Sequence, residues 1–168
     1  EKNLALLTAK KLAEKLMDAG CNVIMTRNTD VFIPLTERAE IANRNGADLC
    51  ISVHYNSASN RSASGIMVFH HGPSSTGKLL ALCISGKIGA KGQLANKGPA
   101  SDMAVAKKSG FSVLRNTTMT GVLLELGFLS NRHDESVVNS DEFRDQISEG
   151  VVEGLRMFFG EEMNDGKK

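Results

Sequence analysis

Apolar residues recur along this chain with helical spacing in some segments and in unbroken runs in others, so the pattern predicts alternating helices and strands. The first segment, "NLALLTAKKLAEKLMD", carries leucines along one helical face and lysines along the other. Asn3 is its candidate N-cap, and Gly20 is the expected stop after its last turn. By the same criteria, helices are predicted over residues 3–18, 34–46, 75–90 and 141–159.

Short apolar runs between these helices are typical of buried strands. Strands are predicted over residues 21–26, 47–56, 65–71, 111–115 and 121–128. Residues 91–110 are rich in Gly, Lys, Ala and Ser and are expected to form a long surface connection. The alternation predicts an α/β fold with three layers, in which a mostly parallel twisted sheet carries helices on both faces. We expect one domain over residues 1–160 and a polar tail over residues 161–168.

Composition and charge exclude several classes of protein. Hydrophobic residues make up 41% and charged residues 23% of the chain, which is the balance of a globular domain. The net charge of +1 favours no polyanionic partner, and no basic patch is interleaved with aromatic residues, so we expect no nucleic-acid binding. No apolar run is long enough for a membrane span. Cys21, Cys50 and Cys83 show no metal-binding spacing and are predicted to be buried thiols.

One carboxylate occupies a position that belongs in the core. In the run "VLLELGF", Glu125 is the only charged residue. Burying a carboxylate without a partner costs several kcal/mol, so Glu125 requires a cation, a network of donors or a metal-bound water. Either a catalytic role or a structural ion pair, for example with Arg115, would meet this requirement.

A histidine occupies a comparable position in "ISVHYN", residues 51–56. Strand alternation places His54 on one face with Ser52 and Asn56. A neutral imidazole at the end of a strand is a good zinc ligand, and a core histidine satisfied by hydrogen bonds is the alternative. Glu1 is a candidate second ligand, or a carboxylate that suits the dipole of the first helix. We expect His54 and Glu125 at one edge of the sheet, because both lie near the carboxyl ends of apolar runs.

Four segments carry a specific combination of short motifs. They are "EKNLALLTAKKLAEKLMDAGCNVIMTR", "LTERAEIANRNGADLCISVHYNS", "SGIMVFHHG" and "SVLRNTTMTGVLLELGFLSN". Each motif is weak alone, but their order and spacing run along nearly the whole chain. Together they resemble the catalytic domain of zinc-dependent N-acetylmuramoyl-L-alanine amidases, which are peptidoglycan hydrolases of bacteria and their phages.

The resemblance implies roles for four residues. Glu1 matches the glutamate zinc ligand at the head of the family's first helix, and His54 matches the histidine ligand of its Ser-x-His-x-Asn motif. Glu125 matches the catalytic base of Leu-x-Glu-x-Gly-Phe, and Asn56 matches the motif asparagine, which we expect to shape or line the site. The implied cofactor is Zn2+, and the implied reaction is hydrolysis of the amide bond between N-acetylmuramic acid and L-alanine.

The same resemblance implies a setting for this activity. The expected partner is peptidoglycan, and the expected location is extracellular, at the cell wall, or at the wall after release as a phage lysin. We expect a monomer without a membrane span. The loops at residues 57–63 and 91–110 are expected to form the walls of an open groove for a polymeric substrate.

The chain departs from the family at its start. The family carries another zinc-binding histidine in a Gly-His-Gly loop upstream of the glutamate ligand, so we expect this chain to be N-terminally incomplete relative to the family. His70, His71 and His133 are not expected to replace that ligand. Two alternatives therefore stay open. One is a non-catalytic peptidoglycan-binding relative, and the other is a zinc carboxypeptidase that docks a free carboxylate on Arg115 or Arg27.

Overall fold

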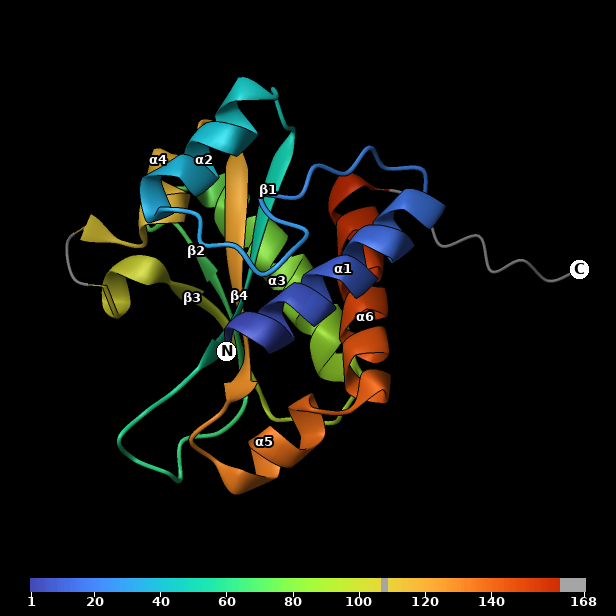
Figure 1. Cartoon of the computed structure of the whole chain (residues 1–168). Helices are drawn as coiled ribbons and strands as arrows, with labels where there is room; N and C mark the ends of the chain where they lie inside the picture. Colours follow the sequence, from blue (N-terminus) through green and yellow to red (C-terminus); the bar gives the residue numbers. More distant parts are fainter. Residues whose placement is uncertain (107–108, 161–168) are drawn as a thin grey trace, which may run out of the picture.

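The protein is described by a computed structural model that covers residues 1–106 and 109–160. Its sheet has four strands in the order β1-β4-β2-β3. The strands are β1 (Leu49–Asn56), β2 (Ile66–His70), β3 (Asn96–Ser101) and β4 (Thr120–Phe128). The pairs β1–β4 and β2–β3 are parallel, and the pair β2–β4 is antiparallel. Figure 1 shows helices on both sides of this sheet, so the predicted three-layer α/β architecture is confirmed.

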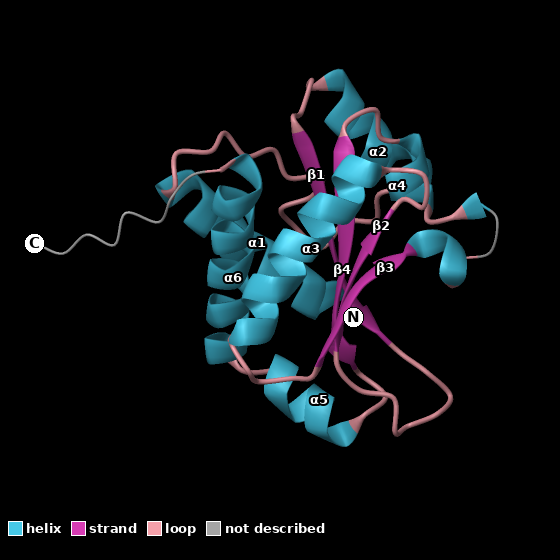
Figure 2. Ribbon diagram, turned by 180° about the vertical axis from the view of Figure 1, so that it is seen from behind, coloured by secondary structure: helices cyan, strands magenta, loops and turns pink. Residues whose placement is uncertain are grey.

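Three long helices cover one face of the sheet: α1 (Lys2–Asp18), α3 (Ser75–Ala90) and α6 (Asp141–Phe159). They enclose the main core with every second residue of β4, namely Val122, Leu124 and Leu126. Helices α3 and α6 approach closely, because Gly154 of α6 has no side-chain carbon to hold it away from the α3 backbone. Figure 2 shows the same layer from behind.

Two short helices, α2 (Leu35–Arg44) and α4 (Ser112–Asn116), cover part of the opposite face. The small core beneath them joins Val113 and Leu114 of α4 to Phe69 and Leu123 of the sheet. Leu123 and Glu125 share this face because they are two positions apart on β4. The face therefore has an apolar half near the start of β4 and a polar half near its end.

Three of the predicted segments differ in the structure. Residues 21–26 are not a strand, because a strand needs a ladder partner and the described residues place none beside the free edge of β1. Residues 111–115 fall largely in α4, a helical turn that places Val113 and Leu114 side by side in the small core. The segment 91–110 contains β3 and the short 3-10 helix η1 (Asp102–Ala104). β3 is polar and contains Pro99, which an edge strand tolerates.

Helix α5 (Arg132–Val138), which follows β4, was not predicted from the sequence. Glu1, rather than the predicted Asn3, occupies the N-cap position of the first helix, and its side chain makes no capping hydrogen bond. Cys21 is exposed, whereas Cys83 is buried as predicted. Among the described helices, none is both long and apolar enough to cross a membrane. The predicted tail at residues 161–168 lies outside the described residues.

Candidate active site

The start of α1 is held against the end of β1. Alternation along β1 turns Tyr55 toward α1, and its buried hydroxyl group shares a 2.7 Å hydrogen bond with the Thr8 hydroxyl. On the other side, the Arg27 guanidinium donates to the backbone carbonyl of Lys2 over 2.7 Å. These contacts fix the first turn of α1, and they bring Glu1 next to the residue before Tyr55, which is His54.

The imidazole of His54 contacts the Glu1 carboxylate. His54 Nδ1 lies 2.7 Å from Glu1 Oε1, and His54 Nε2 lies 3.1 Å from the hydroxyl of Ser52. A carboxylate can only accept, so Nδ1 carries the proton in neutral imidazole and the Ser52 hydroxyl donates to Nε2. The hydrogen bond from His54 holds the pKa of Glu1 below its usual range, although partial burial opposes this.

Glu125 lies opposite His54 on the neighbouring strand. The parallel register of β1 and β4 pairs these two residues directly, so both face the polar half of the sheet. Burial raises the pKa of Glu125 to about 7; the charge of His54 lowers it and that of Glu1 raises it further. Within the described chain, Glu125 Oε2 is buried and has no hydrogen-bond partner. The site thus contains a carboxyl group that can take up or release a proton near neutral pH.

Asn56 ends β1 at the same edge of the sheet. Its side-chain Oδ1 accepts a 2.8 Å hydrogen bond from the amide of Ser57, and its carbonyl accepts one from the amide of Leu129. The strand register shifts between His54 and Asn56, so β1 bends at this point. This geometry suits the expected shaping role of Asn56, and its role toward a substrate stays a prediction.

The structure thus brings Glu1, His54 and Glu125 together and leaves the other candidates elsewhere. Arg115 donates to backbone carbonyls and does not pair with Glu125. His70 ends β2 and His71 follows it; because β2 runs antiparallel to β4, both lie at the opposite edge of the sheet. There His71 Nδ1 lies 3.2 Å from the carboxylate of Asp102. No group of three His, Cys, Asp or Glu side chains able to hold a metal occurs in residues 1–106 and 109–160.

Two buried aspartates, Asp102 and Asp134, order the surrounding loops and were not predicted from the sequence. Asp134 accepts hydrogen bonds from the Ser64 hydroxyl (2.6 Å) and from the amides of Gly65 and Phe128 (2.9 Å each). It thereby ties the loop after β1 to the end of β4. Asp102 similarly accepts from the amides of Gly72 and Phe111. Neither aspartate lies in an apolar run, so hydrophobic periodicity carried no signal for its burial.

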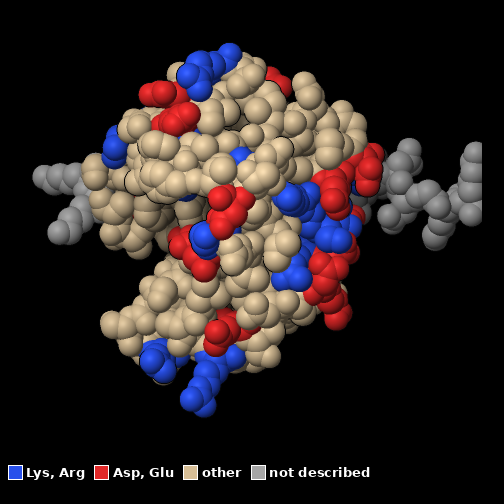
Figure 3. Space-filling view, in the orientation of Figure 1, with Lys and Arg blue, Asp and Glu red and all other residues tan. Residues whose placement is uncertain are grey.

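The molecular surface is hollowed beside these residues. Figure 3 shows a notch between the part of the molecule that carries β3 and η1 and the lower part that carries the loop after β1 and α5. The start of α1 reaches the inner end of this notch, where acidic and basic side chains meet. The loops expected as groove walls therefore stand on either side of a surface depression.

Known proteins resemble the chain in sequence and in fold. It is 37% identical over 161 residues to the "Probable cell wall amidase LytH" of Staphylococcus saprophyticus, and this match covers 96% of the chain and 50% of the relative. The chain therefore spans about half the length of the curated relatives it matches.

Two solved structures share the fold. A crystal structure of N-acetylmuramoyl-L-alanine amidase from Clostridium difficile 630 superposes with a TM-score of 0.87 at 31% identity, covering 95% of this chain and 84% of that one. The catalytic domain of CwlV, an N-acetylmuramoyl-L-alanine amidase from Bacillus (Paenibacillus) polymyxa, gives a TM-score of 0.85 at 26% identity, with 96% and 86% covered. Residues 1–157 match the family model described as N-acetylmuramoyl-L-alanine amidase, and the chain belongs to this family.

Proposed function

We propose that the chain is the catalytic domain of a zinc-dependent amidase that hydrolyses the bond between N-acetylmuramic acid and L-alanine in peptidoglycan, with Glu125 as the general base. The observation that carries this proposal is the buried, unpartnered Glu125 carboxyl group beside the contacting pair of Glu1 and His54. A structural ion pair would occupy the free Glu125 oxygen, and the described residues contain no such partner for it.

The donor set fits part of a zinc site. Glu1 supplies a carboxylate oxygen and His54 an imidazole nitrogen, both of which are common zinc ligands. A catalytic zinc takes three protein ligands and keeps one position open, so two donors are one too few. The third ligand would be a residue outside the described set, such as the histidine that the family carries upstream of the glutamate ligand. When bound, zinc would polarise the scissile carbonyl and acidify the attacking water.

The chain's own residues account for the proton transfers. Glu125 accepts a proton from the attacking water and donates it to the nitrogen of the leaving L-alanine. Burial holds the pKa of Glu125 near 7 in the metal-free chain, so its carboxyl group is suited both to accept and to donate a proton. Ser52 donates to His54 and fixes its orientation. Asn56 shapes the end of β1 beside the notch.

The proposed substrate is consistent with an open site at the surface. A cross-linked polymer needs a site that opens at the surface, and Figure 3 shows a notch in the surface where the start of α1 lies. We place the protein at the bacterial cell wall, as a monomer. A zinc carboxypeptidase is a weaker candidate, because Arg27 and Arg115 both donate to backbone carbonyls and are not free to dock a carboxylate.

The test uses the full natural protein that contains this chain, acting on purified cell walls. Glu125→Gln should reduce the release of new L-alanine amino termini by about 10²–10⁴-fold while the zinc content is retained. His54→Ala should lose activity and zinc together. Glu14→Gln, which changes an exposed glutamate of α1, should keep both.

Each other outcome identifies a different function. Binding of cell walls without any release of amino termini by the parent would indicate a peptidoglycan-binding relative. Release of single free amino acids would indicate a carboxypeptidase. Activity of Glu125→Gln equal to that of the parent would remove Glu125 from the mechanism.

A further inference from the structure

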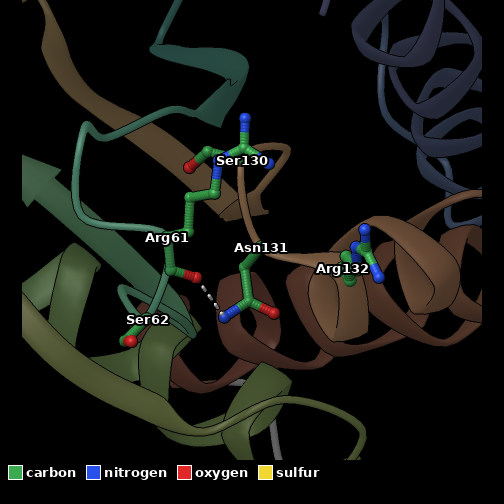
Figure 4. A pocket seen from close by; sticks show the side chains of 5 residues that line it. All are labelled: Arg61, Ser62, Ser130, Asn131 and Arg132. Atoms are coloured by element: carbon green, nitrogen blue, oxygen red, sulfur yellow. Dashed lines mark hydrogen bonds between the residues drawn. The ribbon is translucent and has the colours of Figure 1, made fainter.

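Besides the notch, a polar pocket lies at the edge of the sheet where β1 and β4 end. It has a volume of about 620 Å³ and is lined by Arg61, Ser62, Ser130, Asn131 and Arg132. The first two residues belong to the loop after β1, and the others to the turn after β4 and the first residue of α5 (Figure 4). None of these five residues belongs to the proposed catalytic group.

The pocket carries two positive charges that the fold does not neutralise. Within residues 1–106 and 109–160, the side chains of Arg61 and Arg132 form neither a hydrogen bond nor a salt bridge, and no acidic residue lines the pocket. By contrast, the Arg144 guanidinium donates to backbone carbonyls and lies 3.5 Å from Asp141. Figure 4 shows Arg61 and Arg132 on either side of Asn131. Two free guanidinium groups in one polar pocket are suited to bind carboxylates.

Hydrogen bonds between its two segments hold the pocket in shape. Asn131 Nδ2 donates to the carbonyl of Arg61 over 3.1 Å, as the dashed line in Figure 4 marks. The amide of Ala58 donates to the Ser130 hydroxyl over 3.0 Å. The buried carboxylate of Asp134 joins the end of the same loop to β4. Because the walls are already ordered, a ligand would not have to bear the cost of ordering them.

The pocket lies at the same edge of the sheet as the catalytic group. His54 and Asn56 are two positions apart on β1, about 7 Å of extended chain, and the loop that carries Arg61 begins at Ser57. An extended peptide of five residues spans up to about 17 Å. Because the catalytic group and the pocket lie at the same edge of the sheet, we expect a stem peptide whose first amide bond lies at His54 and Glu125 to extend its later residues toward the pocket.

We propose that this pocket, through Arg61 and Arg132, binds the free carboxylates of the peptidoglycan stem peptide and makes the protein prefer acidic over amidated stems. The choice of ligand rests on the proposed function. The presence of two arginines without partners, and the ordered walls of the pocket, are independent of it. The ligand class is a peptide with carboxylates on or beyond its second residue. Charge-assisted, forked hydrogen bonds between guanidinium and carboxylate give the preference its physical basis.

The experiment measures binding separately from hydrolysis. The chain is kept in chelator and titrated with N-acetylmuramoyl pentapeptide, and separately with the same compound in which every carboxylate is an amide. Isothermal titration calorimetry should give the parent about tenfold tighter binding of the acidic peptide. The preference should shrink as salt is added, because the arginines are exposed.

Two variants locate the preference. Arg61→Gln combined with Arg132→Gln should bind both peptides equally, with an unchanged melting temperature. Arg44→Gln is the control, because Arg44 is an exposed arginine without a described partner at the end of α2. It should keep the preference of the parent.

The remaining outcomes overturn the proposal. A preference that survives in the double variant, or no preference in the parent, would show that the pocket does not select carboxylates. Binding of poly(glycerol phosphate) in place of the acidic peptide would assign the pocket to an anionic wall polymer. A carboxylate preference without any hydrolysis by the full protein would instead contradict the proposed function and leave this pocket in place.

Discussion

Glu125 occupies a position where an apolar side chain would cost the fold less free energy. Its neighbours on β4, Leu124 and Leu126, are fully buried, and the described residues leave its Oε2 atom without a partner. Burial penalises the charged carboxylate and so favours the protonated form. The same burial brings the pKa of the proposed base close to neutral pH. Burial of Glu125 therefore both destabilises the fold locally and suits the side chain to proton transfer.

Glu125→Gln should therefore change how the free energy of unfolding depends on pH, in protein kept free of metal by a chelator. The pKa of Glu125 is about 7 in the folded chain and 4.5 for an ordinary glutamate. Between these values the unfolded chain releases the proton and the folded chain keeps it, so the parent loses stability as the pH rises. The glutamine variant lacks this loss. Between acid and neutral pH, its free energy of unfolding should therefore rise by about 2–3 kcal/mol relative to that of the parent.

Urea unfolding at a series of pH values measures this difference. Above the folded pKa both states of the parent are ionised, so the difference should become constant. The control is Glu14→Gln, whose pH profile should run parallel to that of the parent because residue 14 is exposed. If the Glu125→Gln profile is parallel as well, Glu125 ionises in the folded chain as it does in water.

Among the elements, the long helices and the apolar strands β1, β2 and β4 were predicted almost to their ends, whereas β3 and α4 were not. The leucines of α1 and the apolar face of α6 specify a helix wherever the chain places them. β3 has no apolar alternation, and its place depends on its pairing with β2, which lies far from it in sequence. Residues 111–115 contain two adjacent apolar residues that satisfy a helical turn or a strand equally well. The secondary structure of such segments is determined by the residues they pack or pair with, which lie far away in sequence.

Gly154→Ala should destabilise the packing of α6 on α3. A Cβ atom at residue 154 would lie 2.6 Å from the Cα and 2.9 Å from the backbone nitrogen of Ile84, and backbone cannot move aside as a side chain can. We expect a loss of about 1–3 kcal/mol in the free energy of unfolding, measured with urea. Gly86→Ala, on α3, is the control, because its Cβ would meet nothing within 4 Å. Gly86→Ala should raise the free energy of unfolding by about 0.5–1 kcal/mol, since alanine favours the helix.

The opposite signs of these two substitutions are the test. Both replace a helical glycine by alanine, so propensity alone predicts that both stabilise the protein. A stabilised Gly154→Ala variant would show that α3 and α6 are farther apart than the structure places them.

At the scale of the whole molecule, the candidate site depends on residues that the sequence keeps far apart. Glu1 and His54 are 53 positions apart, and no periodicity relates them. Resemblance to a family predicted their convergence, and the burial of Glu125 within an apolar run could be predicted from physics alone. The arginine pocket could not be predicted, because surface loops carry no pattern that fixes which of their side chains line the same pocket.

Zinc well above its dissociation constant should raise the melting temperature of the chain even though only two ligands hold it, because Glu1 and His54 converge only when α1 is docked on β1. A ligand that binds only the folded state stabilises it by about 2.7 kcal/mol at a concentration 100 times its dissociation constant. Scanning calorimetry with added zinc, and then with excess chelator, measures this shift. His54→Ala should abolish it, whereas His133→Ala, at an exposed position of α5, should not. Magnesium should give a smaller shift, because imidazole is a poor ligand for it. An equal zinc shift in the parent and in His54→Ala would place the metal elsewhere and leave Glu125 without the cation that the proposed mechanism requires.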